Sequence, residues 1–107
     1  MYKIEVYLPP EVLDDFILEL DKINVATIGK YKHCMTWYGV TSSWMPEAGA
    51  KPYRGTPNVK EIADEFKIEF ICDERKLKTI IQHIKQIHPY ETPCINVIQL
   101  IDFETCK

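Results

Sequence analysis

The first eight residues alternate between polar and apolar side chains, a pattern typical of a half-buried strand. In residues 2–8, positions 2, 4, 6 and 8 are apolar or aromatic, while positions 3, 5 and 7 fall on the other face. The two prolines that follow end the strand and suit the first turn of a helix. Over residues 11–23 apolar residues recur at helical spacing, with most acidic residues opposite. We therefore expect a strand followed by an amphipathic helix.

The next stretch predicts a bent strand and its hairpin partner. In residues 25–31 a β-prone run meets Gly29, which indicates a bulge at the beginning of a strand that continues to Tyr38. Residues 39–45 then look like the partner strand, with a turn near Tyr38. Prolines and glycines divide residues 46–58 into a long loop, and its aromatic residues argue against plain disorder.

The clearest strand pattern lies in the second half of the chain. Residues 65–72 alternate strictly, Asp73 is a good N-cap, and a second amphipathic helix follows that ends at His88. Residues 94–101 are apolar on both faces, as in a central or interface strand. We expect the tail from Asp102 to be frayed or to dock on a neighbour.

This order of elements predicts an α+β fold. A ferredoxin-like split βαβ sandwich accommodates it, with an antiparallel sheet covered on one face by two helices and a long β-hairpin/loop extension. The other sheet face is mixed and carries Lys3, Glu5, Tyr7, Glu69 and Ile71. Oligomerisation and a solvated polar face explain such a surface equally well.

Length and composition narrow the function classes. A chain of 107 residues with 46% hydrophobic and 27% charged residues is expected to form one globular domain, residues 1–107. Its net charge of -3 and interleaved charges argue against nucleic-acid binding. No apolar run reaches the roughly 20 residues that span a membrane, and no signal pattern follows Met1. We therefore expect a cytoplasmic protein without a membrane partner.

The cysteines are expected to be reduced thiols. Cys34, Cys72, Cys94 and Cys106 include no closely spaced pair, and the sequence shows no secretion signal. Cys72 and Cys94 fall in apolar strand patterns, where a free cysteine behaves as a small hydrophobic residue. Cys34 has a potential reactive neighbour in His33, but adjacent strand residues point to opposite faces. We find no convincing catalytic constellation.

The stretch His-Pro-Tyr-Glu-Thr-Pro-Cys at residues 88–94 is the strongest candidate for a site. Its two prolines stiffen the connection between the second helix and the last strand, so three polar side chains are presented together. An alternative is that His88 caps the helix at the negative end of its dipole. Both interpretations stay open on the residues alone.

A divalent metal ion is one candidate ligand. His33, His88 and Glu91 are residue types that transition metals select, although their spacing matches no strong metal motif. Glu65 and Glu69 occupy alternate strand positions and could line one face. They are more often exposed cross-strand partners of lysines such as Lys3 or Lys67.

An anion or nucleotide phosphate is a second candidate ligand, for the glycine-rich run at residues 49–55. Lys51 and Arg54 lie beside glycines that expose the backbone. The alternative is a structural loop whose glycines satisfy turn geometry. The candidate ligand-binding residues in this run and in the stretch at residues 88–94 are Gly49, Lys51, Tyr53, Arg54 and Tyr90.

Several spaced motifs resemble known families. His88-Pro-Tyr-Glu-x-Pro before an apolar strand resembles the CutA divalent-cation-tolerance family, of the trimeric PII-like group. A wider match is similar to the PII/CutA-like domain inserted in YqfO-type, Nif3-related proteins. It consists of Ile28-Gly-x-Tyr31-x-x-Cys34, Pro46-x-x-Gly49-Ala50-x-Pro52-Tyr53-x-Gly55, Glu65-x-Lys67-Ile68-Glu69 and His88-Pro-Tyr-Glu.

The resemblance implies a regulatory or ligand-sensing module, without catalysis, that binds in a cleft between subunits of a homotrimer. His88, Tyr90, Glu91 and the Gly/Pro loop would line that cleft. The two-metal site of YqfO-type proteins belongs to flanking Nif3-like halves, which we do not expect in this chain. Two alternatives remain: a small metal-dependent hydrolase using His33, His88 and Glu91, and a partner subunit of a Nif3-like protein.

Overall fold

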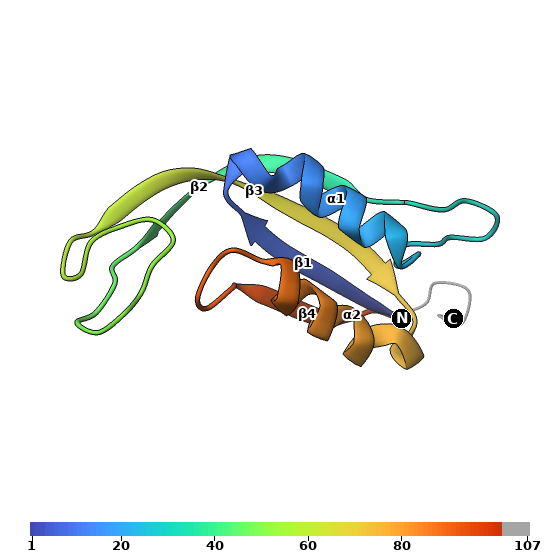
Figure 1. Cartoon of the computed structure of the whole chain (residues 1–107). Coiled ribbons are helices and arrows are strands. Elements are labelled where there is room, and N and C mark those ends of the chain that lie inside the picture. Colours follow the sequence, from blue (N-terminus) through green and yellow to red (C-terminus); the bar gives the residue numbers. More distant parts are fainter. Residues whose placement is uncertain (102–107) are drawn as a thin grey trace.

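The structure is a computed structural model, and it describes residues 1–101 (Figure 1). The predicted fraying or docking of the tail from Asp102 lies outside the described residues, as does Cys106. The elements follow in the order β1 (Tyr2–Leu8), the short 3-10 helix η1 (Pro10–Val12), α1 (Leu13–Lys22), β2 (Thr36–Trp44), β3 (Glu61–Cys72), α2 (Glu74–Ile87) and β4 (Ile95–Gln99).

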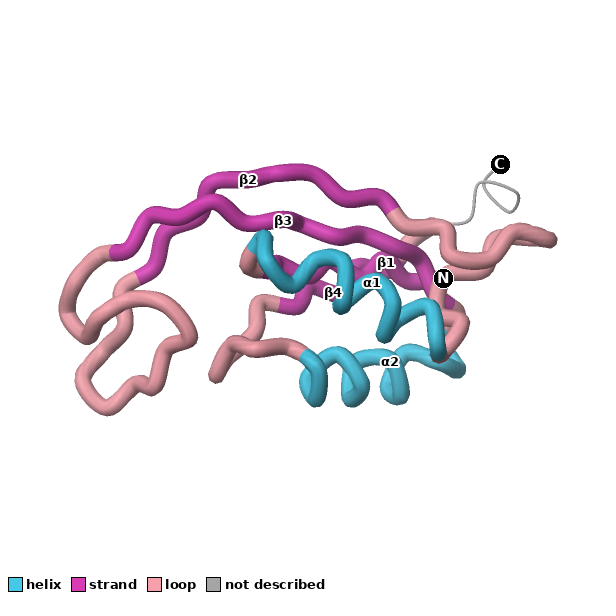
Figure 2. Tube along the Cα trace, turned by 45° about the horizontal axis from the view of Figure 1, so that its top comes forward, coloured by secondary structure: helices cyan, strands magenta, loops and turns pink. Residues whose placement is uncertain are grey.

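The four strands form one antiparallel sheet in the order β2-β3-β1-β4. Both helices lie on the same face of this sheet, as Figure 2 shows. This confirms the predicted ferredoxin-like α+β fold with two helices on one face. The second helix begins as expected, because the Asp73 side chain accepts a hydrogen bond from the Arg75 N–H, and it ends at Ile87.

The core lies between the sheet and the helices. Alternate residues of β1 and β3 point into it, where they meet the apolar stripes of α1 and α2. Its fully or almost fully buried members are Ile4, Val6, Leu8, Leu13, Phe16, Leu20, Val25, Ala26, Ile68, Phe70, Cys72, Ile80 and Ile84. The alternation in residues 2–8 and 65–72 therefore identified the inward faces correctly.

The opposite sheet face carries a cluster of paired charges. Glu5 forms ion pairs with Lys3 and Lys67, each at 3.3 Å. Glu69 forms ion pairs with the same two lysines, at 3.0 and 3.6 Å. Burial alone would raise the pKa of the Glu5 carboxyl, but its hydrogen bonds, including those from Asn96 and the lysines, lower it to about 2. This face is a charged network around a buried carboxylate.

The predicted bent strand and local hairpin are wrong. Residues 23–35 form a loop, in which Ile28 and Tyr31 make an isolated bridge. β2 passes straight through Tyr38 and pairs along its whole length with β3. Nine residue pairs to a distant strand outweigh what a two-residue turn at Tyr38 could form, so long-range pairing overrides the local turn signal.

Two strand boundaries also differ from the prediction. β3 begins at Glu61, four residues before the predicted start, because the hairpin with β2 extends past the sheet proper. β4 is shorter than predicted and lies at the sheet edge, where Val97 and Ile98 are both 43% exposed. An apolar edge strand of this kind is available for contact with another chain.

The hairpin of β2 and β3 gives the molecule an elongated shape. Beyond the helices it ends in a long loop, residues 45–60, which confirms the predicted loop (Figure 1). The radius of gyration is 15.4 Å, compared with about 13 Å for a compact domain of this size. Within residues 1–101, no helix is long and apolar enough to cross a membrane.

Candidate ligand-binding site

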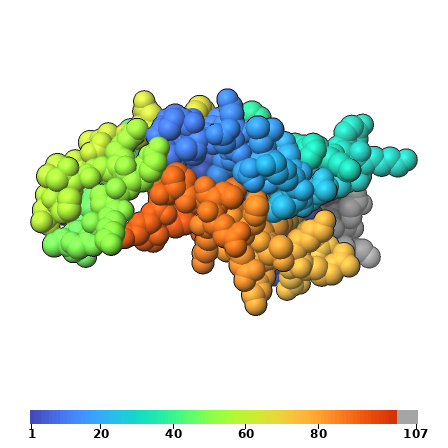
Figure 3. Space-filling view, viewed as in Figure 1, coloured from blue at the N-terminus to red at the C-terminus, as the bar shows by residue number. Residues whose placement is uncertain are grey.

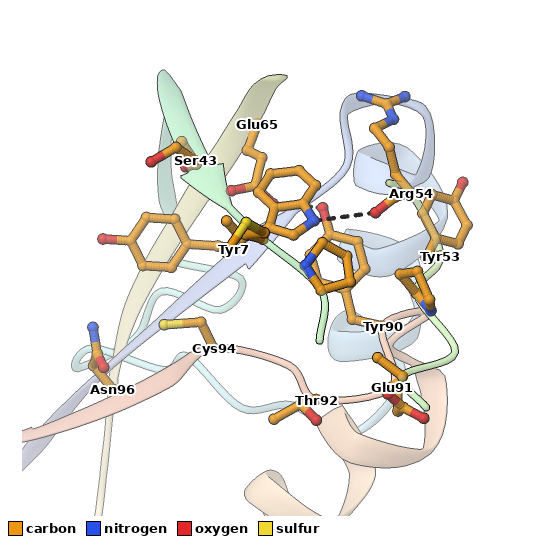
Figure 4. A pocket seen from close by; sticks show the side chains of 16 residues that line it. Tyr7, Ser43, Tyr53, Arg54, Glu65, Tyr90, Glu91, Thr92, Cys94 and Asn96 are labelled. Carbon is orange, nitrogen blue, oxygen red and sulfur yellow. Dashed lines mark hydrogen bonds between the residues drawn. The ribbon is translucent and has the colours of Figure 1, made fainter. Parts of the chain in front are cut away.

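A cavity of about 680 Å³ lies where the hairpin extension approaches the segment that joins α2 to β4 (Figure 4). Its walls combine the end of β2, the loop at residues 45–60, the middle of β3 and residues 90–96. The loop and the joining segment also meet on the surface of the space-filling view (Figure 3). The side chains that matter most below are Trp44, Tyr53, Glu65, Tyr90, Glu91 and Cys94.

His88 anchors the joining segment. Its backbone N–H donates to the carbonyl of Ile84 at 2.9 Å, so it ends α2 as the cap interpretation predicted. Its ring is only 7% exposed and packs edge-on against Phe16. Nε2 lies 2.7 Å from the Tyr7 carbonyl, and Nδ1 accepts the Tyr90 N–H at 3.1 Å. These partners assign the neutral tautomer with the proton on Nε2.

The protonation state of His88 follows from its surroundings. Burial lowers the pKa of the imidazole by more than the Tyr7 carbonyl and the nearby Glu65 raise it. Both ring nitrogens are already occupied by backbone partners. The ring therefore positions Tyr90 and leaves no lone pair free for a metal or a proton transfer.

Tyr90 projects from this anchor into the cavity and reaches β3. Its hydroxyl donates to the Glu65 carboxylate at 2.5 Å. Burial, together with that carboxylate, raises the pKa of the Tyr90 phenol. Glu65 itself is only 5% exposed, so its predicted role as an exposed partner of a lysine is wrong. For Glu69 the predicted pairing with Lys3 and Lys67 is confirmed, but its side chain is largely buried and not exposed.

The loop at residues 45–60 is folded against the end of β2. The Trp44 indole N–H donates to the Arg54 carbonyl at 3.1 Å, and the Asn58 N–H donates to the Pro46 carbonyl at 2.7 Å. Gly55 has a φ of +110°, and a Cβ there would lie 3.3 Å from both Pro46 and the Trp44 indole nitrogen. Glycine is therefore required for this close approach.

Contacts with two glutamates hold the loop over the cavity. The Tyr53 hydroxyl donates to Glu11 at 2.6 Å, and the Arg54 guanidinium lies 3.7 Å from the same carboxylate. The backbone N–H of Lys51 donates to the Glu91 carboxylate, at 3.1 and 3.3 Å from its two oxygens. The Lys51 N–H thus already holds an anionic group, which belongs to the chain itself.

The predicted ligand-binding residues divide into two groups. Tyr53, Arg54 and Tyr90 line the cavity, as does Glu91 from the predicted metal group. Gly49 and Lys51 stay outside it; Gly49 has a φ of +92° and serves the turn geometry of the loop.

The predicted metal ligands do not gather in one chain. His33 lies in the loop before β2, where its Nδ1 is 2.9 Å from the Asp21 carboxylate, and Cys34 contacts the carbonyl of Tyr31. Within residues 1–101, no group of three or more His, Cys, Asp or Glu side chains is placed to hold a metal ion. His88 and Glu91 share the joining segment, but each has another partner.

Among the cavity residues that sequence reasoning missed, three matter most for the site. Trp44 ends β2, but the false hairpin hid its role. Glu65 looked like one of several alternating strand charges. Cys94 was predicted to be a small hydrophobic strand residue, whereas it precedes β4, is exposed and lines the cavity. The neighbouring His-Pro-Tyr-Glu motif and the glycine-rich loop were the sequence signals that pointed to this region.

Comparisons with known proteins agree on the fold. The family model described as CutA1 divalent ion tolerance protein matches residues 53–105. The solved PII-like protein CutA from Nostoc sp. PCC 7120 is 21% identical with a TM-score of 0.70, and the match covers 94% of this chain and 81% of the Nostoc chain. A solved Bacillus cereus protein related to NIF3 is 24% identical with a TM-score of 0.81, over 94% of this chain and 26% of that one.

The curated proteins are similar to this chain over almost its whole length. A GTP cyclohydrolase 1 type 2 homolog of Staphylococcus epidermidis is 30% identical over 99 residues, which are 92% of this chain and 27% of that protein. The chain has the PII/CutA-like fold and is similar to a segment of Nif3-related proteins. This PII/CutA-like domain spans about a quarter of the length of the curated relatives it matches.

Proposed function

We propose that residues 1–107 form one small PII/CutA-like binding or regulatory module of the cytosol, which senses a metal ion or a small ligand and carries out no catalysis. The observation that carries this proposal is the cavity of about 680 Å³, which has the size of a small-molecule site. It is walled by Trp44, Tyr53 and Tyr90, with a few polar groups placed among them. Such a combination suits binding and orientation of a ligand.

The hydrogen bonding of the polar groups favours binding over chemistry. His88 uses both ring nitrogens to hold backbone groups, so it lacks the free lone pair of a general base. The Tyr90 phenol has a raised pKa and donates to Glu65. Glu91 accepts from the loop backbone. Each group fixes the shape of the cavity.

A homo-oligomer, with a trimer favoured, would complete this module. The cavity opens beside β4, an edge strand with exposed apolar residues, and the β2–β3 hairpin makes the molecule elongated. Both features favour contact with further copies. In such an assembly the cavity would lie in a cleft between subunits.

A divalent ion at His88, Glu91 and His33 remains our second ligand proposal. Because these residues do not gather in one chain, the ion would require a second copy to bring its His33 to the joining segment. It would also have to displace the Tyr90 N–H from Nδ1 of His88 and the Lys51 N–H from Glu91. A metal-dependent hydrolase would need the same arrangement. The observation in favour is that His88 and Glu91 lie in the same joining segment, where Glu91 lines the cavity.

A thermal-shift panel on metal-stripped protein tests the proposal, with divalent cations, nucleotides and small organic ions as candidates. A ligand that binds only the folded state raises the Tm, and the rise grows with its concentration. We expect this rise to be lost in Trp44→Leu and kept in Trp37→Leu, because Trp37 lies outside the cavity. If both variants respond alike, the cavity is not the binding site.

A second candidate function is that of a partner or part of a Nif3-like protein. The observation in its favour is the match to about a quarter of proteins called GTP cyclohydrolase 1 type 2 homolog. Co-purification of this chain with separately expressed Nif3-like halves tests it. A stable complex, lost in the variant Ile98→Glu or another surface variant, would support this function; separate elution at micromolar concentrations would contradict it.

A further inference from the structure

The carboxylate of Glu65 is an unusual group for the wall of a cavity. It is only 5% exposed, and its one hydrogen bond comes from the neutral Tyr90 hydroxyl. Among the described residues, no lysine, arginine or histidine forms an ion pair with it. A buried carboxylate without a cation is costly, because it has lost its hydration without gaining an opposite charge.

The nearby cations are already engaged elsewhere. Lys67, two residues further along β3, pairs with Glu5 and Glu69. The Arg54 guanidinium points away from the cavity, as Figure 4 shows, and lies beside Glu11. His88 is held in its neutral form by two backbone partners. Residues 1–101 therefore supply no cation to the interior of the cavity.

The remaining walls suit a positive charge. Tyr90 stacks obliquely with Tyr53, with ring centroids 5.7 Å apart, and with Trp44 at 6.4 Å. The faces of Trp and Tyr rings attract organic cations, most strongly when water is excluded. A second carboxylate, that of Glu91, stands at the rim. A cavity walled by aromatic faces and carboxylates, with no inward-pointing cation among the described residues, favours a positively charged ligand.

We infer that the ligand of this cavity is an organic cation, a molecule with an ammonium or guanidinium group that lies against the aromatic walls and pairs with Glu65. The inference rests on the proposed function of the cavity as a ligand site. It differs from nucleotide binding at the glycine-rich loop, because the Lys51 N–H there already holds the Glu91 carboxylate.

The test uses the full chain, in whatever assembly it forms in solution, and the indole N–H resonances of its two tryptophans. Trp44 lines the cavity and Trp37 does not, so Trp37 is an internal control, assigned with Trp37→Phe. The probes are choline and agmatine. The matched neutral probe is 3,3-dimethyl-1-butanol, which replaces the quaternary nitrogen of choline with carbon. ATP serves as the anionic probe.

We expect at least one cation to shift the Trp44 resonance saturably and to leave Trp37 in place. The neutral probe should bind about tenfold more weakly than choline, since it lacks the charge that the aromatic faces and Glu65 attract. Glu65→Gln should weaken binding of the cation about tenfold or more. Glu47→Gln is the control. It removes an exposed charge in the loop at residues 45–60 that does not line the cavity, and it should leave the affinity for the cation within about twofold of the natural value.

Equal binding of choline and its neutral analogue would overturn the inference, as would a Trp44 shift by ATP and by neither cation. That second result would leave the ligand-binding function standing and change its ligand class. If neither cation shifts Trp44, the inference fails, and the thermal-shift panel decides separately whether any ligand enters the cavity. The comparison of the two choline-shaped probes needs only the natural chain, so it holds even if Glu65→Gln does not fold.

Discussion

His88 connects three parts of the molecule through one small ring. It ends α2, receives the Tyr90 backbone and reaches the carbonyl of Tyr7 at the end of β1. The helix end was predictable, because Pro89 follows an apolar-periodic run. The Tyr7 partner was not, because it lies 81 residues away and leaves no local trace in the sequence. The proline after His88 therefore predicted that its backbone position is constrained, but not that the Tyr7 carbonyl holds its ring.

His88→Ala should destabilise the fold by about 1–3 kcal/mol, because the carbonyl of Tyr7 and the N–H of Tyr90 would lose buried hydrogen-bond partners. Urea denaturation followed by circular dichroism measures this loss. His33→Ala is the control, since its ring is half-exposed and lies beside the Asp21 carboxylate at the surface, and it should change stability by less than about 0.5 kcal/mol. Equal losses in the two variants would contradict a special role for His88.

The pH dependence of stability should also report on His88. Its pKa in the folded state is lowered, so the unfolded chain binds the proton more readily, and stability falls as pH decreases below about 6.5. The contribution is complete above that pH. The Glu5 and Asp73 carboxyls, whose pKa values are lowered to about 2, titrate at much lower pH and do not obscure this range. Urea midpoints at pH 7.5, 6.5 and 5.5 measure the slope, and His88→Gln should remove most of it.

At the scale of elements, the predictable parts were those in which a local pattern and the tertiary fold agree. The strand at residues 65–72 and both helices have one consistently apolar face that meets the core. The prediction for residues 25–45 was wrong because their glycines and β-prone residues fit two pairings, a local hairpin and a long-range pairing with another strand. The partner strand, β3, decided between them, and a chosen partner is not visible in the pairing segment itself.

Gly55→Ala tests how the loop of residues 45–60 is held. A side chain at its φ of +110° is strained, and a Cβ would lie 3.3 Å from Pro46 and from the Trp44 indole nitrogen, so we expect a loss of about 1–3 kcal/mol or a displaced loop. The Trp44 indole resonance should move in the same variant. Gly39→Ala is the matched control, because a Cβ there meets nothing within 4 Å, and it should be nearly neutral. An unchanged Trp44 signal in Gly55→Ala would show that the loop tolerates the side chain.

At the scale of the whole molecule, the cavity exists because distant segments meet. The Lys51 N–H and the Glu91 carboxylate are 40 residues apart in sequence, and Tyr90 and Glu65 are 25 apart. The sequence identified several of these residues as candidates for two different sites, a phosphate loop and a metal site. Only the family resemblance placed Tyr90, Glu91 and the Gly/Pro loop at one cleft, and it placed that cleft between subunits. The residue patterns alone could not show that Tyr53, Tyr90 and Glu91 share a cavity within one chain, since that depends on how far the β2–β3 hairpin extends.

The elongated shape leads to a prediction about assembly. β4 is an apolar edge strand, and Ile98 is 43% exposed on the sheet face that no helix covers. If copies associate through this edge, Ile98→Glu should reduce the mass in solution from that of an oligomer, with a trimer favoured, to that of one chain, because a charge would be buried at the contact. Light scattering measures the mass, and circular dichroism checks that the fold is kept.

Leu18→Glu, at a 58% exposed position on the outer side of α1, is the matched control and should keep the natural mass. A monomeric natural chain, or an Ile98→Glu variant with unchanged mass, would place the assembly surface elsewhere or remove it.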